Sequence, residues 1–296
     1  MHYNRLRNSE LNISQIALGC MSLKSDSAES SCIIEAAYDC GINYFDTADL
    51  YDFGENEVLL GKALKKFRDK VYIATKVGNR WKEDRSGWTW DVSAKYIFDA
   101  VDASLKRLQT DYIDVYQIHG GTKEDNFEEV LDTLERLKAQ GKIRYYGISS
   151  IRPNVFLRFT EQSNIISNMM QYSMLDTRPE KYFDRFKDKI SVLARGAYAQ
   201  GVLLGKAKDS YLSHSSTNMQ SILTYIEELA SQYQLHKETI ALAYVLRKKV
   251  VASSIVGIRT MEQFLALKQS IIELDKLNIV FDESRIPKID YTDHLT

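Results

Sequence analysis

The chain has 296 residues and a formal net charge of −1, so it lacks the basic surplus typical of nucleic-acid-binding proteins. Its hydrophobic fraction of 44% and charged fraction of 27% are those of a globular protein with a sizeable core. No apolar run approaches the roughly 18 residues of a membrane span, and the N-terminus lacks a signal-peptide core. Cys20, Cys32 and Cys40 have no zinc-ligand spacing. We expect reduced thiols, no metal, and a cytoplasmic protein that is a monomer by default.

Short apolar segments alternate with helical segments along most of the chain. Residues 5–7 and Asn12–Ser14 predict a small N-terminal β-hairpin, and Ile16–Gly19 a first strand after it. Seven further strands are expected at residues 43–45, 71–75, 112–118, 144–149, 165–172, 190–194 and 250–256.

Apolar residues spaced three and four apart predict the helices. They are expected at Ala28–Asp39 (with Asp26 as N-cap and Gly41 after the end), 57–67, 93–108 (capped by Ser93), 126–140, 154–160, 218–249 (split near 235–237) and Met261–Leu274. Residues 79–91 hold three tryptophans among charges and are expected to form a long loop. Residues 282–296 show no periodicity and are expected to form a surface tail.

Strands separated by helices pair in parallel, and eight of them can close into a barrel. We therefore predict the α/β class: a (β/α)8 TIM barrel with an N-terminal β-hairpin. The barrel is expected as a single domain over residues 1–281, with the tail over 282–296. A doubly wound open sheet is the alternative, and it is less favoured because no Gly-x-Gly-x-x-Gly follows a strand.

Four titratable residues lie at or near the ends of three predicted strands. Asp46 ends the second strand, with Tyr51 five residues further on, Lys76 follows the third strand and His119 the fourth. The C-terminal strand ends of a parallel barrel open onto one face, where chemistry takes place. Taken singly, Asp46 could cap a turn, Tyr51 could be a core or surface tyrosine, and Lys76 could be solvated. His119, followed by two glycines, leans toward function.

Several segments, in order, resemble the aldo-keto reductase family. They read FDTADLY at 45–51, ATK at 74–76, DYIDVYQIH at 111–119 and AQG at 199–201. The resemblance covers roughly residues 3–275. The short C-terminus and the run VLARG at 192–196 are similar to the bacterial and channel β-subunit-like branches.

The resemblance implies an oxidoreductase that transfers a hydride from a nicotinamide to the carbonyl of a small aldehyde or ketone. Tyr51 matches the proton donor, and Lys76 the cation that stabilises the phenolate. Asp46 matches the carboxylate that keeps Lys76 charged, and His119 the residue that hydrogen-bonds the substrate oxygen. The alternative is a cofactor-sensing binding protein with slow turnover, like the channel β-subunits.

The resemblance also assigns residues to the cofactor. Ser149 matches a residue that hydrogen-bonds the nicotinamide amide, and Arg195 matches the side chain that stacks on the ring. Where the family has a Gln this chain has Met169, and Gln171 is the nearest amide. The other residues expected at the cofactor are Gly19, Cys20, Met21, Asp46, Ser150, Gly196, Ala199, Gln200, Gly201, Leu203, Lys206, Gly257, Arg259 and Gln263.

The guanidinium of Arg259 is a natural partner for a 2′-phosphate, which predicts NADPH rather than NADH. The plainer role of Arg259 and Gln263 is a solvated helix start. The family's Glu/Asn pair at the last helix is replaced by Ala266 and Leu267, so hydrogen bonds to the adenine are expected to be lost.

The substrate pocket is expected to be lined by Met21, Trp81, Trp88 and Trp90, which would favour an apolar or aromatic carbonyl. The alternative for the tryptophans is a satellite cluster under the loop. Cys20 is expected to line the pocket rather than act as a nucleophile, because no basic residue adjoins it in sequence.

Overall fold

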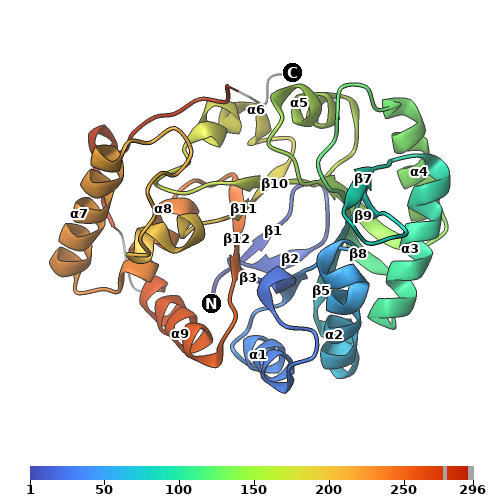
Figure 1. The fold of residues 1–296 in the computed structure, drawn as a ribbon, viewed down its shortest axis with the longest axis horizontal. Coiled ribbons are helices and arrows are strands. Elements are labelled where there is room, and N and C mark those ends of the chain that lie inside the picture. Colours follow the sequence, from blue (N-terminus) through green and yellow to red (C-terminus); the bar gives the residue numbers. More distant parts are fainter. Residues whose placement is uncertain (276–278, 293–296) are drawn as a thin grey trace.

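The computed structural model describes residues 1–275 and 279–292, and its centre is a closed barrel of parallel strands (Figure 1). The barrel strands are β3 (Ile16–Gly19), β4 (Tyr44–Asp46), β5 (Tyr72–Val77), β8 (Ile113–Ile118), β9 (Ile143–Ile148), β10 (Ser167–Gln171), β11 (Ser191–Arg195) and β12 (Val251–Gly257). They are almost entirely buried because side chains on one face fill the barrel and those on the other pack under helices. The predicted TIM barrel is confirmed.

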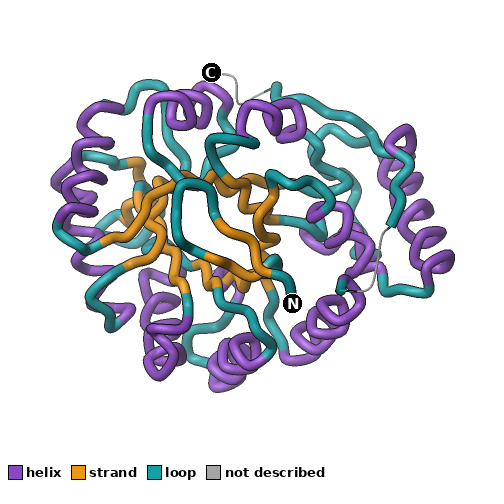
Figure 2. The backbone as a smooth tube through the Cα atoms, turned by 180° about the vertical axis from the view of Figure 1, so that it is seen from behind, coloured by secondary structure: helices purple, strands orange, loops and turns teal. Residues whose placement is uncertain are grey.

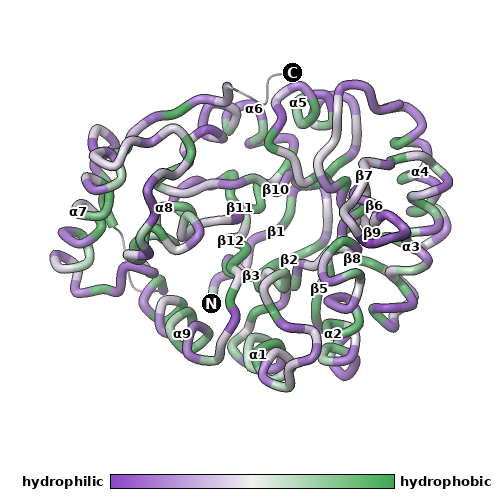
Figure 3. Tube along the Cα trace, in the orientation of Figure 1, coloured by the Kyte–Doolittle hydropathy of each residue, from purple (hydrophilic) through white to green (hydrophobic). Residues whose placement is uncertain are grey.

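Helices surround the barrel (Figure 2). They are α1 (Ala28–Asp39), α2 (Glu55–Leu64), α3 (Ala94–Leu108), α4 (Phe127–Ala139), α5 (Pro153–Gln162), α6 (Phe183–Phe186), α7 (Ser216–Tyr233), α8 (Lys237–Leu246) and α9 (Met261–Leu274). Figure 3 shows hydrophobic residues along the strands and on parts of the helices. None of the described helices combines the length and apolar character that a bilayer crossing requires.

Local signals fix the helix boundaries. The Ser93 side chain accepts a hydrogen bond from the Tyr96 amide at the start of α3, as expected of an N-cap. The predicted break after α7 is confirmed, since Gln234 adopts a left-handed conformation at its C-cap. The prediction of Asp26 as the N-cap of α1 is wrong. Ser27 occupies that position because the helix begins at Ala28, as predicted, and Asp26 lies inside the turn that joins the Lys24 carbonyl to the Ser27 amide.

Residues 79–91 are not the loop that the sequence predicts. They form an antiparallel hairpin of β6 (Asn79–Trp81) and β7 (Trp88–Trp90), in which Trp81 is paired with Trp88. Strands of three residues are too short to show alternation, so the pattern of charges concealed them. Neither α6 nor the 3₁₀ turns Cys20–Ser22, Tyr51–Gly54, Arg178–Tyr182, Ala199–Leu204 and Glu283–Arg285 were expected. The helix predicted over 57–67 begins at Glu55 and continues beyond Leu64 as the 3₁₀ turn Lys65–Lys70.

The N-terminal hairpin, β1 (Tyr3–Arg5) and β2 (Asn12–Ser14), covers the N-terminal end of the barrel. Its Leu6, Leu11 and Ile13 are fully buried among the side chains of the barrel interior. The Arg7 amide also donates to the Ser191 hydroxyl at the start of β11. Burial of such a side chain contributes about 1.5–3 kcal/mol. The hairpin therefore closes one end, and only the C-terminal strand ends are left to form an open site.

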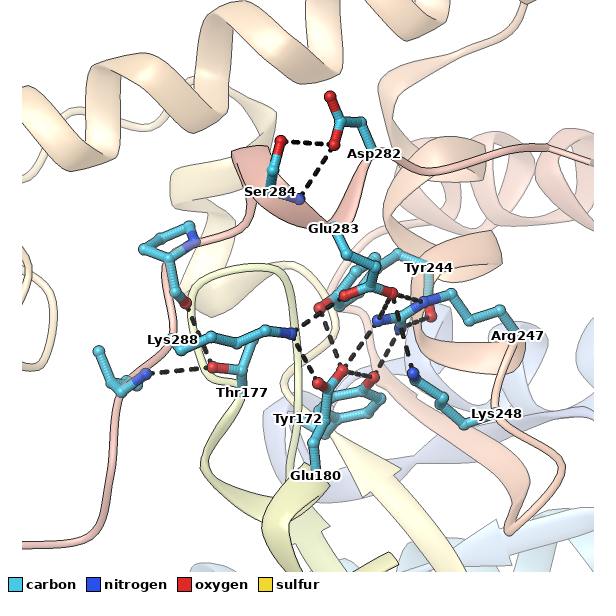
Figure 4. A network of polar contacts seen from close by, with 12 residues as sticks. Tyr172, Thr177, Glu180, Tyr244, Arg247, Lys248, Asp282, Glu283, Ser284 and Lys288 are labelled. Atoms are coloured by element: carbon cyan, nitrogen blue, oxygen red, sulfur yellow. Dashed lines mark hydrogen bonds and ion pairs between the residues drawn. The ribbon is translucent and has the colours of Figure 1, made fainter.

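The segment from residue 282, expected as a surface tail, is mostly exposed but fastened to the barrel at its described positions. Ile286 and Tyr291 are buried. Arg247, which caps the C-terminal end of α8, contacts Glu180 and Glu283 at 2.8 Å, and Lys288 contacts the same two carboxylates at 2.8 and 3.0 Å (Figure 4). Burial raises the pKa of Glu180, but Lys288, Tyr172 and Arg247 outweigh it and lower that pKa to about 2. The division at residue 281 stays a prediction.

Candidate active site

The alternation of side chains along the barrel strands brings Asp46 and Lys76 together with Gln117. Tyr44, Ala74 and Val115 belong to the apolar cluster inside the barrel. Asp46, Lys76 and Gln117 lie two residues further along the same strands, and residues two apart share a face of a strand. A polar layer therefore lies directly above an apolar one, at the C-terminal end of the barrel.

Lys76 is the centre of this layer, and its side chain is fully buried. Its Nζ donates to Asp46 Oδ1 at 2.6 Å, to the Thr47 carbonyl at 2.7 Å and to the Tyr51 hydroxyl oxygen at 3.2 Å. The Gln117 amide donates to the other Asp46 oxygen at 3.2 Å. Both members of the ion pair are thus hydrogen-bonded, which a buried pair needs in order to persist.

The charges of the pair follow from these contacts. Burial lowers the pKa of Lys76, but the charge of Asp46 and then that of Tyr51 outweigh burial and raise it. Burial also raises the pKa of Asp46, against the effects of Lys76 and Gln117. We assign the charged pair at neutral pH, because Nζ has oxygen acceptors at hydrogen-bonding distance and Asp46 accepts two hydrogen bonds.

His119 lies beside the proton-donor candidate. Its ring and the Tyr51 ring are 5.8 Å apart between centroids, in an edge-to-face arrangement. Burial first, and then the charges of Lys76 and Arg195, lower the pKa of His119 to about 3. The Nδ1 atom is buried and has no hydrogen-bond partner among the described residues. His119 is therefore a neutral imidazole at physiological pH with hydrogen-bonding capacity unused.

Tyr51 begins a tight turn with an unusual backbone. Asp52 and Phe53 have φ angles of 48° and 53°, and Gly54 follows at 90°. A left-handed conformation costs a non-glycine residue about 1–2 kcal/mol, so surrounding contacts must hold the turn. The Trp81 indole donates a hydrogen bond to the carbonyl of Leu50, just before the turn, at 3.0 Å. The centroid of its ring lies 4.2 Å from that of Phe53, inside the turn.

Asp49 is a second buried carboxyl near this turn. Its Oδ2 accepts from the Tyr96 hydroxyl at 3.2 Å, and Oδ1 has no hydrogen-bond partner among the described residues. Burial, followed by the charge of Glu57, raises the pKa of Asp49 to about 7, against Tyr96 and Arg107. In the unfolded chain the same carboxyl ionises near pH 3.9.

We therefore expect the stability of the Asp49→Asn variant to fall less than that of the wild type when the pH is raised. As the pH rises, the unfolded state gives up this proton before the folded state does. The contribution of Asp49 to the free energy of unfolding is therefore complete below about pH 3.9 and is lost as the pH rises to about 7. Between pH 5 and 8 the wild-type free energy of unfolding should fall by about 1–4 kcal/mol more than that of the variant. Urea unfolding at both pH values measures this. The exposed Asp99→Asn is the control, and an equal pH dependence in Asp49→Asn and wild type would contradict the assignment.

The residues predicted at the cofactor lie along the same rim. Gly19, Gln171, Arg195 and Gly257 end barrel strands, and Gly19 is paired with Gly257. Arg195 donates to the Gln171 amide oxygen at 3.2 Å, and Gln171 donates to the Tyr211 hydroxyl at 3.0 Å. Ser149 and Ser150 follow β9, Cys20 and Met21 follow β3, and Gly196 follows β11.

Two further groups extend this rim. Ala199, Gln200, Gly201 and Leu203 lie in the turn Ala199–Leu204, where the first three have positive φ angles. Lys206 packs against Gly201. At the start of α9 the Arg259 amide donates to the Gln263 side-chain oxygen at 2.8 Å.

This rim fits an anionic dinucleotide. Lys206 and Arg259 are exposed, and neither forms an ion pair with a residue that the structure describes. Arg195, at the end of β11, is a third cation on this rim, and its charge acts on Asp46 and His119. Met169 is buried in the apolar interior, which leaves Gln171 as the amide at the end of that strand. Burial raises the pKa of the Cys20 thiol, which does not favour a nucleophile.

The four residues predicted for the substrate pocket have different surroundings in the structure. Trp81 lies at the Tyr51 turn, whereas Trp90 donates to Asp125 at 2.7 Å and packs over Gly78. Trp88 and Met21 are exposed by 52% and 64%. The structure therefore brings Trp81, together with Phe53, next to the proton-donor candidate. Trp81 and Trp88 are paired across the hairpin, and a pocket lined by all three indoles stays a prediction.

Sequence reasoning missed several polar partners. Gln117 could have been found, because it lies on β8 two residues beyond Val115, and residues two apart share a face of a strand. Asn168, fully buried on β10, accepts from the Ser150 amide at 3.1 Å. Tyr211 and Phe53 come from irregular segments that carry no periodic signal. Within the described residues, no group of three or more His, Cys, Asp or Glu side chains could hold a metal ion.

Comparisons with known proteins agree with this geometry. Residues 15–290 match the model of the aldo/keto reductase family. The chain is 45% identical over 273 residues to the uncharacterized oxidoreductase YqkF of Bacillus subtilis, covering 89% of both proteins. It is 29% identical to the NADH-specific methylglyoxal reductase of Escherichia coli, over 87% of this chain and 90% of that one.

A solved structure gives the same result. The holo form of the aldo-keto reductase AKR11C1 from Bacillus halodurans superimposes with a TM-score of 0.91 at 40% identity, covering 99% of both chains. The relation to the channel β-subunit-like branch stays a prediction. The chain folds into this barrel and matches the family model over nearly all of its length. It therefore belongs to the aldo/keto reductase family and is an oxidoreductase.

Proposed function

We propose that this protein reduces aldehydes or ketones with NADPH and that Tyr51 donates the proton. One observation carries the proposal: the Tyr51 hydroxyl lies 3.2 Å from the Lys76 ammonium, which Asp46 holds at 2.6 Å. An ordinary phenol is a poor acid at neutral pH. A fixed ammonium at this distance is placed to stabilise the negative charge that proton transfer leaves on the phenol oxygen.

Each residue of the site has a separate role in the proposed reaction. A bound nicotinamide supplies the hydride for the carbonyl carbon. Tyr51 gives its proton to the carbonyl oxygen, and Lys76 stabilises the phenolate that is left. Asp46 and the Thr47 carbonyl keep Lys76 in place. Neutral His119 is suited to hydrogen-bond the carbonyl oxygen and so orient it.

The cofactor is held, in this proposal, along the rim from Arg195 to Arg259. Arg195 and Gln171 contact the nicotinamide with Ser149, and the Ala199–Leu204 turn with Lys206 holds the pyrophosphate. Arg259 meets the 2′-phosphate, which favours NADPH. A relative of this chain is named as NADH-specific, so the choice of cofactor needs its own measurement.

Substrates in this proposal are small carbonyl compounds with an apolar or aromatic group. Support comes from the paired rings of Phe53 and Trp81 at the Tyr51 turn and from the exposed Met21 on the same rim. We place the protein in the cytoplasm as a monomer, in line with its three free cysteines.

Steady-state oxidation of NADPH and NADH with a panel of aliphatic and aromatic aldehydes tests the function. We expect turnover of about 1 s⁻¹ or faster with NADPH and an aromatic aldehyde, within the usual range of enzymes. Arg259→Ala should weaken NADPH binding by about 10- to 100-fold, since a hydrogen bond to a charged group contributes about 1.5–3 kcal/mol. NADH binding should not change.

The exposed Arg136→Ala, on α4, is the matched control and should bind both cofactors as wild type does. Turnover far below this rate with every aldehyde, combined with tight NADPH binding, would favour a cofactor-sensing binding protein instead. Equal weakening of NADPH and NADH by Arg259→Ala would contradict the 2′-phosphate contact.

A further inference from the structure

The turn that carries Tyr51 rests on a partly buried ion pair between α2 and α3. Arg107 Nε donates to Glu57 Oε2 at 2.6 Å, and Glu57 is fully buried. The other Glu57 oxygen accepts from the Thr75 hydroxyl at 2.6 Å. Thr75 directly precedes Lys76 on β5. A single carboxylate therefore connects both helices with the strand that carries the central ammonium.

The Arg107 side chain also supports the turn directly. A Cβ atom added at Gly54 would lie 2.7 Å from Arg107 Nε and 2.8 Å from its Cδ, so this side chain packs against the glycine. Gly54 and the two residues before it are left-handed, a conformation that persists only where surrounding structure fixes it. Arg107 fills the space beneath the turn at this point.

Helix α3 holds the other side of the turn as well. Tyr96, near the start of α3, donates to Asp49, and the Asp49 amide donates to the Lys76 carbonyl at 3.3 Å. The helix thus contacts the chain both before and after Tyr51. The contact between the Tyr51 hydroxyl and Lys76 is already 3.2 Å, so a further shift of about 0.5–1 Å would break it.

We propose that Arg107, together with Glu57, is a positioning residue that keeps the Tyr51 hydroxyl within reach of Lys76. The proposal rests on Tyr51 being the proton donor. Arg107 belongs to α3 and acts through Gly54 and Glu57, so its loss should lower kcat without changing cofactor affinity or the KM for the carbonyl. A misplacement of about 1 Å can cost about 100-fold in rate.

Arg107→Met is the first variant, with Arg68→Met as its matched control. Arg68 pairs with buried Asp114 at 2.8 Å near the starts of β5 and β8, at the opposite end of the barrel. Both changes break an arginine–carboxylate pair in which the carboxylate is fully buried. We expect kcat to fall about 10- to 100-fold in Arg107→Met and to stay within about twofold of wild type in Arg68→Met. The Kd for NADPH should be unchanged in both.

A double-mutant cycle with Tyr51→Phe separates positioning from other effects. If Arg107 acts through the Tyr51 hydroxyl, Arg107→Met should cause no further loss in the Tyr51→Phe background. Should Arg107→Met fail to fold, the pair Arg107→Met with Glu57→Gln removes the arginine without leaving a buried charge, and the same kinetics apply. The proposal is overturned if folded variants keep wild-type kcat, or if the full loss persists without the Tyr51 hydroxyl. Full activity of Tyr51→Phe alone would instead refute the proposed proton donor.

Discussion

Tyr51→Phe should lower kcat by about 100- to 10,000-fold, the range that a positioned general acid contributes. The change removes only the hydroxyl that contacts Lys76 and keeps the ring beside His119. Binding of NADPH should stay within about twofold of wild type, because the hydroxyl is needed for proton transfer rather than for holding the cofactor. Stopped-flow measurement of NADPH oxidation at saturating aldehyde, with a separate fluorescence titration of NADPH, distinguishes the two effects.

Tyr3→Phe is the matched control for this loss. The Tyr3 hydroxyl donates to the Gly41 carbonyl at 2.9 Å in the N-terminal hairpin, at the closed end of the barrel. Its removal takes away a tyrosine hydroxyl far from the proposed chemistry, and kcat should not change. Full turnover by Tyr51→Phe would refute the assigned acid, whatever the likeness to other aldo/keto reductases.

Lys76→Met should destabilise the protein as well as inactivate it. The variant leaves the Asp46 carboxylate, 3% exposed, with only the Gln117 amide to compensate its charge. Removing one partner of a buried ion pair costs about 3–5 kcal/mol. Because Asp46 can relieve this penalty by taking up a proton, the loss of stability should be smaller at low pH than at pH 8. Urea unfolding at pH 5 and 8 measures this difference.

Adding Asp46→Asn to Lys76→Met separates stability from chemistry. The double variant no longer buries an unpaired charge, so most of the lost stability should return and its pH dependence should flatten. Turnover should remain low, because nothing then stabilises the phenolate. Recovery of kcat in the double variant would show that the ammonium serves only to neutralise Asp46.

The barrel could be predicted because each of its parts has a local signal. Apolar strands, helices at spacings of three and four, and the break near residues 235–237 all appear in the sequence and in the structure. The strand ends predict that Asp46 and Lys76 lie at one face of the barrel, whereas Tyr51, in the turn Tyr51–Gly54, was added to them through the family resemblance. His119 was placed by the same reasoning, although its depressed pKa depends on neighbours that only the fold reveals.

The parts that escaped prediction depend on irregular backbone or on pairings between distant segments. The hairpin at Trp81 and Trp88 exists because two three-residue strands meet, and neither is recognisable by itself. The support of Gly54 by Arg107 joins residues more than fifty positions apart across two helices. The anchoring of Tyr291 similarly needs its distant contact with Arg178. No periodicity in one dimension encodes such contacts.

The N-terminal hairpin affects the route by which protons from solvent can reach the site. Leu6, Leu11 and Ile13 at the base and Tyr44, Ala74 and Val115 in the layer above it are all fully buried, so among the described residues apolar side chains separate Lys76 from the solvent at the N-terminal end of the barrel. If Tyr51 is the proton donor, the proton that replaces the one it gives up has to reach it from the C-terminal side of the barrel. Under the proposed function, a ligand bound on that side would shield the ammonium and the phenol from bulk water, so Tyr51 would regain its proton after the ligand leaves.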